Sequence, residues 1–266
     1  MRSINVNGET LRYERVGRGQ PLLLIHSLGT GCWLWREQMA HWCRSMDVIA
    51  FDLRGHGGST HNGPVTVETI ADDLRVALDA MKLGAVQVVA ISMGGPIVSH
   101  LYSADPEAIS RIVIADSFAR QGSAGASRVM ALEESLRSTS MADYAKSYAE
   151  GTLHPSTDKR LFEKLTTSVA SMEKEVYLQI ARSVFTSDVA ALMTGIKCPV
   201  RVVVGEQDTR TPPALSEEIA RLIGHSDLLR VERAAHLANL DNPDGFHSAI
   251  DSFLSPSQPG NGERAR

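Results

Sequence analysis

The alternation of short apolar runs with helical patterns constrains the fold of this 266-residue chain more than any other feature. Runs that are apolar at nearly every position are typical of strands buried on both faces of a parallel sheet. Between two of them, apolar residues recur at steps of three and four over residues 67–81, which predicts a helix. Such β-α-β units wind into an open sheet covered by helices. The runs are PLLLIH (21–26), DVIAFD (47–52), AVQVVAI (85–91), RIVIAD (111–116), CPVRVVVGEQD (198–208) and DLLRVE (227–232).

Three segments depart from this alternation of strand-like and helical patterns. Two alternating stretches flank Asn7-Gly8, a dipeptide suited to a tight hairpin, so we expect an antiparallel N-terminal edge. Residues 121–188 show helical periodicity and no convincing strand, which predicts a helical cap inserted into a core of residues 1–120 and 189–256. The tail, residues 257–266, has no hydrophobic face, and we predict that it is disordered.

The charge, the hydrophobic runs and the cysteine content argue against several classes of function. The formal net charge of −4 does not favour binding to nucleic acid, which is itself negatively charged. The sequence contains no run of 18 apolar residues, the length that would predict a membrane span. The N-terminus lacks the apolar run of a signal peptide, so we expect a cytoplasmic protein. Three scattered cysteines indicate reduced packing residues rather than disulfides or a zinc site.

Candidate catalytic residues follow the predicted strands at the edge where an open α/β sheet binds ligands. Ser92, in the stretch AISMGG, has small neighbours that suit a nucleophile on a sharp strand-to-helix turn, although Ala90 stands where glycine is usual. Asp208 and His236 complete the order nucleophile, acid, base. An imidazole takes the proton of the serine hydroxyl, and a carboxylate orients the imidazole and stabilises its charged form.

Each assignment has an alternative. Ser92 could be a structural serine at a strand end, and His236 could be a packing histidine. Asp116 also ends a strand and competes with Asp208 as the acid; we favour Asp208, because its loop leads from a strand into a helix that starts with proline. The glycine-rich loop of residues 52–59 lacks the spacing of a phosphate cradle.

The developing oxyanion needs backbone N–H donors that already point toward it. Met93 directly follows the nucleophile at the start of a helix, and Leu28 lies in the loop after residues 21–26. We predict that these two amides form the oxyanion hole. Trp33 is a candidate for the substrate pocket, although most tryptophans are core residues.

The motifs together resemble the α/β-hydrolase fold superfamily, most closely the 3-oxoadipate enol-lactonase group. The resemblance covers nearly the whole chain except the insertion and the tail. It implies a triad of Ser92, Asp208 and His236, oxyanion donors at Leu28 and Met93, and no cofactor or metal. The motifs are HSLGTGCWLW, DLRGHGGS, AISMGG, GEQDTRTPP and AAHLANLDNPDGF.

We therefore expect a serine hydrolase that opens a small carboxylic ester or lactone through an acyl-enzyme, with 3-oxoadipate enol-lactone as the candidate substrate. In the insertion, which contains no tryptophan, Arg128 is a candidate to meet a substrate carboxylate. The same triad could instead serve a cofactor-free perhydrolase or haloperoxidase-like reaction, or carbon–carbon bond hydrolysis. A non-catalytic small-molecule receptor is a further alternative.

Overall fold

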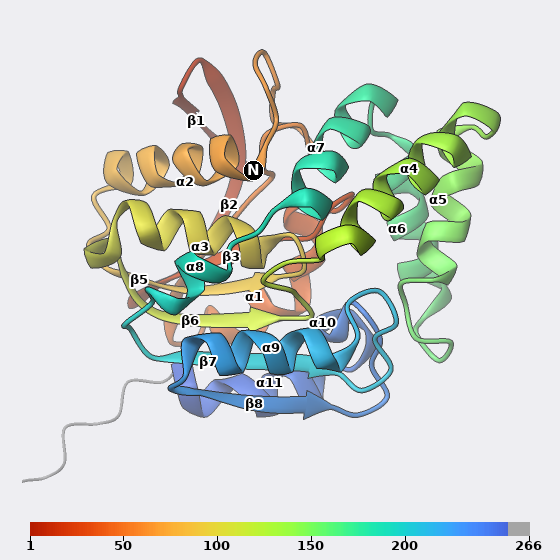
Figure 1. Cartoon of the computed structure of the whole chain (residues 1–266). Helices are drawn as coiled ribbons and strands as arrows, with labels where there is room; N and C mark the ends of the chain where they lie inside the picture. The colour runs from red at the N-terminus through yellow and green to blue at the C-terminus, as the bar shows by residue number, and fades with distance from the viewer. Residues whose placement is uncertain (255–266) are drawn as a thin grey trace, which may run out of the picture.

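One eight-stranded sheet forms the centre of the protein, in a computed structural model that describes residues 1–254 (Figure 1). The predicted tail (257–266) and the end of the predicted core at residue 256 lie outside the described residues. The strands are β1 (Arg2–Val6), β2 (Glu9–Gly17), β3 (Gln20–Ile25), β4 (Met46–Phe51), β5 (Val86–Ile91), β6 (Ile109–Ala115), β7 (Val200–Gly205) and β8 (Ser226–Val231).

The strands follow the order β1-β2-β4-β3-β5-β6-β7-β8 across the sheet. Strands β3 to β8 pair in parallel, whereas β1 pairs with β2 and β2 with β4 in the antiparallel sense. Asn7 and Gly8 both have positive φ, at 50° and 78°, and close the hairpin between β1 and β2. This confirms the prediction of a mostly parallel sheet with an antiparallel N-terminal edge.

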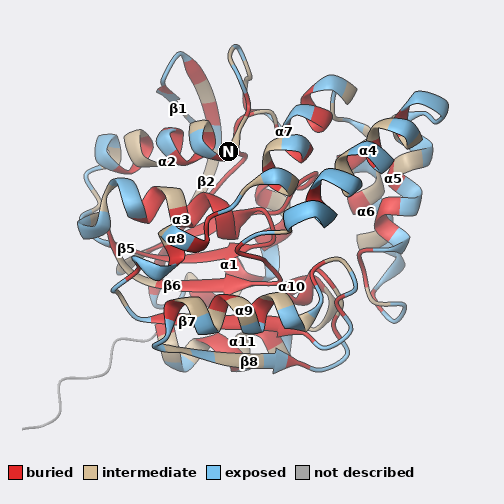
Figure 2. Ribbon diagram, in the orientation of Figure 1, coloured by how far each residue is buried: buried red, intermediate tan, exposed pale blue. Residues whose placement is uncertain are grey.

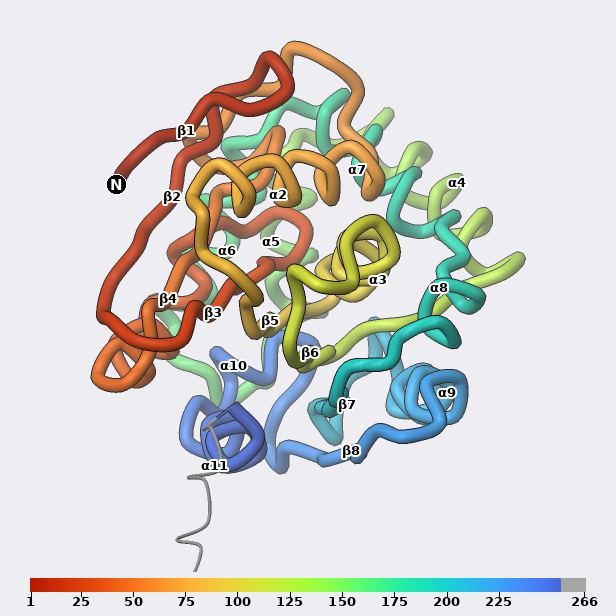
Figure 3. Tube along the Cα trace, turned by 90° about the vertical axis from the view of Figure 1, so that its left-hand side faces the viewer, coloured from red at the N-terminus to blue at the C-terminus, as the bar shows by residue number. Residues whose placement is uncertain are grey.

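Helices cover both faces of the sheet. Helices α2, α3, α8 and α9 pack on one face and α1 and α11 on the other, as the end-on view in Figure 3 shows. Their bounds and those of the short helices are η1 (Cys32–Trp35), α1 (Arg36–Trp42), α2 (Val67–Met81), α3 (Gly94–Ala104), η2 (Pro106–Ala108), α8 (Ala190–Thr194), α9 (Pro213–Ile223), α10 (Ala238–Asp241) and α11 (Pro243–Leu254).

Burial explains why the strands read as unbroken apolar runs. Every residue of β4 and β5 is buried, and the central strands are buried along their length in Figure 2. By contrast the edge strand β8 is buried only at Val231. Among residues 1–254, no helix combines the length and the apolar character needed to cross a membrane.

Four further helices lie between β6 and α8, in the region predicted to be a helical cap. They are α4 (Gly122–Ser138), α5 (Met141–Glu150), α6 (Lys159–Ala170) and α7 (Lys174–Thr186). Figure 1 shows them beyond the end of the sheet toward which the parallel strands point. Helix α4 packs on α7 and α5 on α6, so the four form two pairs. Whether they are a separate domain stays a prediction.

Candidate active site

Ser92 lies on a tight turn between β5 and α3. Its φ of 55° is in the left-handed region, which is uncommon for a residue other than glycine and costs backbone energy. Neighbouring residues hold this conformation: the Ser92 N–H donates to Ala115 O at 2.9 Å, and the Ser117 hydroxyl donates to Ser92 O at 2.6 Å. The end of β6 thus fixes the turn.

The glycines after Ser92 are required by close packing. A Cβ at Gly95 would lie 2.1 Å from Ser117 Oγ. A Cβ at Gly94 would lie 2.9 Å from Ile25 O and 3.1 Å from the Cβ of Ala90. The methyl group of Ala90 therefore lies where this turn has only just enough space, and the absence of a side chain at Gly94 accommodates it.

His236 joins Ser92 to Asp208. Its Nε2 lies 2.8 Å from Ser92 Oγ, and its Nδ1 lies 2.9 Å from Asp208 Oδ2. An ionised carboxylate only accepts hydrogen bonds, so the proton of the neutral ring is on Nδ1 and the lone pair of Nε2 faces the serine hydroxyl. The structure thus brings the three residues into one hydrogen-bonded chain, all of them buried.

Asp208 has hydrogen-bond donors on both carboxylate oxygens. The backbone N–H groups of Arg210 and Thr211 donate to Oδ1, and the Thr211 hydroxyl lies 2.6 Å from Oδ2. Burial opposes the ionisation of Asp208, but the electrostatic attraction to the His236 ring and these hydrogen bonds outweigh it, so the pKa of Asp208 lies below its usual value. Asp208 is therefore charged and oriented at neutral pH.

Asp116 makes different contacts. Its Oδ1 accepts the Gly205 N–H at 2.7 Å and its Oδ2 accepts the Ala238 N–H at 3.1 Å. These bonds tie the end of β6 to β7 and to the loop that carries His236. Asp208, not Asp116, is the carboxylate that contacts the imidazole.

Leu28 and Met93, the predicted oxyanion donors, flank the serine from two loops. Leu28 lines the same cavity as Ser92, and Met93 caps the N-terminus of α3, where the helix dipole favours negative charge. Within the part of the chain that the structure describes, neither backbone N–H has a protein acceptor. His26 supports the Leu28 loop, because its Nδ1 lies 2.8 Å from Ser27 O and its Nε2 accepts the Leu53 N–H.

The cavity at Ser92 is small and lined by cationic and aromatic side chains. Its volume is about 20 Å³, room for about one water molecule, so a substrate enters only when lining side chains move apart. From the insertion and the loop after β7, it is lined by Arg128, Tyr148, Phe185 and Arg210. Sequence reasoning identified Arg128 but missed Arg210 and Tyr148.

The two arginines of this cavity have only neutral partners within the described residues. The Arg128 guanidinium donates to Gln121 Oε1 and Arg210 O and lies over the Phe185 ring. That of Arg210 donates to the carbonyl oxygens of Tyr148 and Gly151. Burial and the nearby charge of Arg210 lower the pKa of Arg128. The cavity therefore holds positive charge without a bound counter-charge, which favours an anionic ligand.

The structure places Trp33 away from Ser92, in contrast to the pocket role considered for it. Its Nε1–H donates to Ser168 Oγ at 3.1 Å, and the Lys164 ammonium lies over its ring. Trp33 lines a separate cavity of about 430 Å³ between η1, α6 and α10. The residue follows β3 closely in sequence, but η1 turns its ring toward α6.

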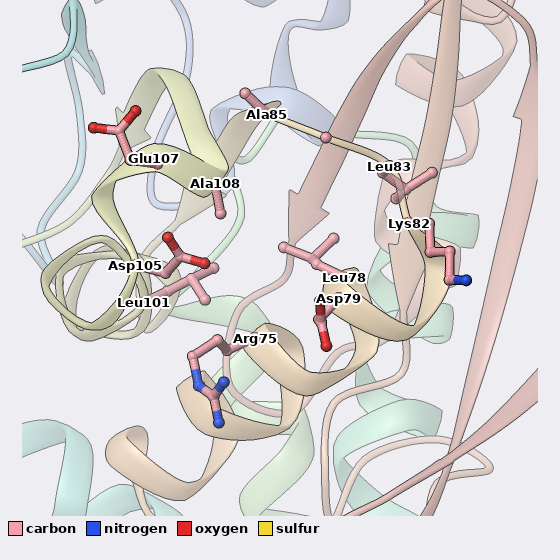
Figure 4. Close-up of a pocket in the computed structure, with 11 residues that line it drawn as sticks. Arg75, Leu78, Asp79, Lys82, Leu83, Ala85, Leu101, Asp105, Glu107 and Ala108 are labelled. Atoms are coloured by element: carbon pink, nitrogen blue, oxygen red, sulfur yellow. The ribbon is translucent and has the colours of Figure 1, made fainter.

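A wider cavity of about 510 Å³ lies at the opposite end of β5 (Figure 4). It lies between the C-terminal ends of α2 and α3 and includes Leu78, Leu101 and the segment just before β5. Ser92 follows the other end of this six-residue strand, about 20 Å along it. None of the predicted site residues lines this cavity.

In residues 1–254, no group of three or more His, Cys, Asp or Glu is placed to hold a metal ion.

Comparison with known proteins identifies relatives over nearly the full chain. The sequence profile of the alpha/beta hydrolase family matches residues 22–249. A 3-oxoadipate enol-lactonase of Acinetobacter baylyi is 28% identical over 250 residues, which are 92% of each chain.

Two solved structures have the same fold. The enol-lactonase of Burkholderia xenovorans superposes with a TM-score of 0.86 at 25% identity, over 95% of this chain and 99% of that one. A thermophilic esterase of Thermogutta terrifontis, with malate bound, gives 0.84 at 26% identity, over 95% and 96%.

Proposed function

The chain belongs to the alpha/beta hydrolase family, and we propose that it hydrolyses small carboxylic esters or lactones through an acyl-enzyme on Ser92. The hydrogen-bonded chain from Ser92 Oγ through His236 to Asp208 carries this proposal, at 2.8 and 2.9 Å. The positive φ of Ser92 also supports it, as do the N–H groups of Leu28 and Met93, which have no protein acceptor among residues 1–254.

The proposed acylation step uses this geometry. His236 Nε2 takes the proton of Ser92 as Oγ attacks the acyl carbon, and the electron pair of the C=O bond moves to its oxygen. The N–H groups of Leu28 and Met93 stabilise this oxyanion, and the charge of Asp208 stabilises the imidazolium. When the carbonyl forms again, the C–O bond to the leaving oxygen breaks and that oxygen takes the proton from Nε2. In a lactone, the leaving oxygen remains part of the acyl group.

Deacylation repeats the sequence with water. His236 Nε2 takes a proton from water as its oxygen attacks the acyl carbon, and a second oxyanion forms in the same N–H pair. The bond from the acyl carbon to Ser92 Oγ then breaks, and Oγ recovers the proton from Nε2. The acid leaves and the free enzyme is restored, with no redox step or co-reactant besides water.

We further propose that the substrate is a lactone that carries a carboxylate, as 3-oxoadipate enol-lactone does. Arg128 and Arg210 support this proposal, because both line the Ser92 cavity and both lack an acidic partner among the residues that the structure describes. A carboxylate next to these guanidinium groups would supply the missing counter-charge. Two enol-lactonases among the relatives agree with this substrate class.

The test compares wild-type protein with Ser92→Ala on 3-oxoadipate enol-lactone and on p-nitrophenyl valerate. We expect the variant to lose about 10⁴-fold or more in kcat. A fluorophosphonate should label Ser92 of the wild type, as peptide mass spectrometry would show. Unchanged turnover in Ser92→Ala would exclude the serine mechanism, and turnover of the valerate ester alone would exclude the lactone.

A further inference from the structure

The segment from Tyr148 to Thr152, at the C-terminal end of α5 and just after it, is hydrogen-bonded to three loops of the candidate site. The Tyr148 hydroxyl donates to Leu28 O at 3.2 Å. Thr152 O accepts the backbone N–H of His236 at 3.1 Å. The Arg210 side chain donates to Tyr148 O and Gly151 O, at 3.0 and 3.1 Å. One short segment of the insertion therefore contacts the loops that carry the proposed oxyanion donor, base and acid.

Tyr148 occupies the centre of this arrangement. The residue is 5% exposed, and the Arg210 guanidinium lies 4.2 Å from the centre of its ring. Arg210 lies in the same loop as Asp208, and its backbone N–H donates to Asp208 Oδ1. The ring thus packs against the acid loop while the hydroxyl contacts the Leu28 loop.

The hydrogen bond to Leu28 O acts on the peptide next to the one that carries the Leu28 N–H. The peptide unit before the Leu28 Cα contains this N–H and Ser27 O, and Ser27 O accepts hydrogen bonds from the N–H and hydroxyl of Thr30. The peptide unit after the Cα contains Leu28 O and leads to Gly29, which has a φ of 79° and the conformational freedom of glycine. Only the Tyr148 hydroxyl holds this second unit through a side chain among residues 1–254.

We propose that Tyr148 is a positioning residue, whose hydroxyl fixes the Leu28–Gly29 peptide and thereby aims the Leu28 N–H at the oxyanion. This proposal rests on the proposed serine mechanism. The insertion then supplies part of the catalytic alignment in addition to covering the site. Because a donor aimed at the oxyanion acts mainly in the transition state, loosening it lowers turnover more than it weakens substrate binding.

The test is Tyr148→Phe, which keeps the ring against Arg210 and removes only the hydroxyl. Losing an oxyanion donor completely costs about 10²–10³ in kcat, and a donor that remains but moves more freely costs less. We expect kcat and kcat/KM to fall together by about tenfold on p-nitrophenyl valerate, with KM unchanged. A short-chain alkyl trifluoromethyl ketone, which adds to Ser92 and forms an oxyanion, should bind about tenfold more weakly.

Tyr144→Phe is the matched control. Tyr144 lies one turn earlier on α5, and its hydroxyl contacts the Tyr177 hydroxyl at 3.0 Å rather than the Leu28 loop. It does not line the cavity at Ser92. We expect this variant to keep wild-type kcat and wild-type affinity for the trifluoromethyl ketone. Thermal unfolding of both variants would show that each is folded at the assay temperature.

The outcomes separate this proposal from the proposed function. If Ser92→Ala abolishes turnover but Tyr148→Phe matches the wild type in kcat and in ketone affinity, positioning by Tyr148 is wrong and the serine mechanism stands. Equal losses in Tyr144→Phe and Tyr148→Phe would also overturn the positioning role, because they would indicate a general effect on α5. If Ser92→Ala retains turnover, the serine mechanism itself is wrong.

Discussion

Asp116 and Asp208 follow neighbouring parallel strands, β6 and β7, yet their carboxyl groups have opposite pKa shifts. Burial, and then the negative charge of Asp208, raise the pKa of Asp116 well above its usual value. The pKa of Asp208 is lowered despite burial, because His236 and Thr211 stabilise its charge. The charged form of Asp208 is thus favoured at the expense of ionisation at Asp116.

This pair gives a direct test of which carboxylate serves His236. We expect Asp208→Asn to lower kcat by about 10⁴-fold, because an amide in place of the carboxylate favours the wrong imidazole tautomer. Asp116→Asn should retain kcat within about tenfold. It should also lower the free energy of unfolding by about 1–3 kcal/mol, because one backbone N–H then faces the NH₂ group of the new side chain and loses its hydrogen-bond acceptor. Steady-state kinetics and urea unfolding of both variants check this, and the reverse pattern would assign the acid to Asp116.

Arg128 provides a test of substrate charge. Arg128→Met keeps a long apolar side chain at this position and removes the guanidinium that lies over the Phe185 ring. We expect kcat/KM for mono-p-nitrophenyl glutarate, which is anionic, to fall about tenfold to a hundredfold, since a charge-assisted hydrogen bond is lost. The value for neutral p-nitrophenyl valerate should change less than threefold.

The matched control for Arg128→Met is Arg120→Met. Arg120 is exposed and pairs with Glu218, so its removal should change neither ester. Equal losses on the anionic and neutral esters in Arg128→Met would contradict a carboxylate subsite.

Two buried histidines predict that stability falls in acid. Burial lowers the pKa of His26 to about 4, and burial together with the nearby His26 lowers that of His56 to about 3. The unfolded chain titrates near 6.5, so below this pH it takes up protons that the folded protein does not. Their stabilising contribution is complete above pH 6.5 and is lost progressively as the pH falls toward 4 and then 3. Urea unfolding between pH 7 and pH 4 would measure this loss.

His56→Phe isolates one of these two groups. It removes a titrating ring whose Nε2 is buried without a partner among the described residues. We expect the variant to lose less stability than the wild type over the same pH range. An identical pH dependence in both proteins would show that His56 does not contribute.

The left-handed backbone at Ser92 predicts that two inactive variants of this residue differ in stability. Ser92→Gly relieves a conformation that glycine adopts freely, whereas Ser92→Ala keeps the strain. We expect both variants to be inactive, and Ser92→Gly to be more stable than Ser92→Ala by about 1 kcal/mol. The midpoints of urea unfolding, at unchanged slope, compare them. A less stable glycine variant would indicate that the turn is not strained.

Much of the fold and the core of the candidate site follow from the sequence because their signals are local. Strand burial appears as apolar runs such as residues 85–91. Ser92 comes directly after a strand, and Asp208 and His236 lie in the loops that follow strands. The carboxyl ends of parallel strands converge, so a local pattern is enough to predict that these residues meet.

The remaining features depend on contacts between distant segments. Nothing near Tyr148 in the sequence indicates that its hydroxyl reaches Leu28, 120 residues earlier. Arg210 lies two residues after Asp208, so the motif GEQDTRTPP contained a usable signal for it. Trp33 is a candidate for the pocket by sequence, but its direction is set by η1 and by packing on α6, which periodicity does not reveal.

The hydrogen bond from the His236 N–H to Thr152 O has a consequence for protein engineering. A chimera that exchanges the whole of residues 121–188 for the corresponding segment of a relative would replace the anchors of the His236 and Arg210 loops along with the cap. An exchange of α4, α6 and α7 alone would leave the α5 turn with its native partners. Recombination boundaries that keep residues 141–153 with the sheet should therefore yield active hybrids more often than boundaries at the ends of the insertion.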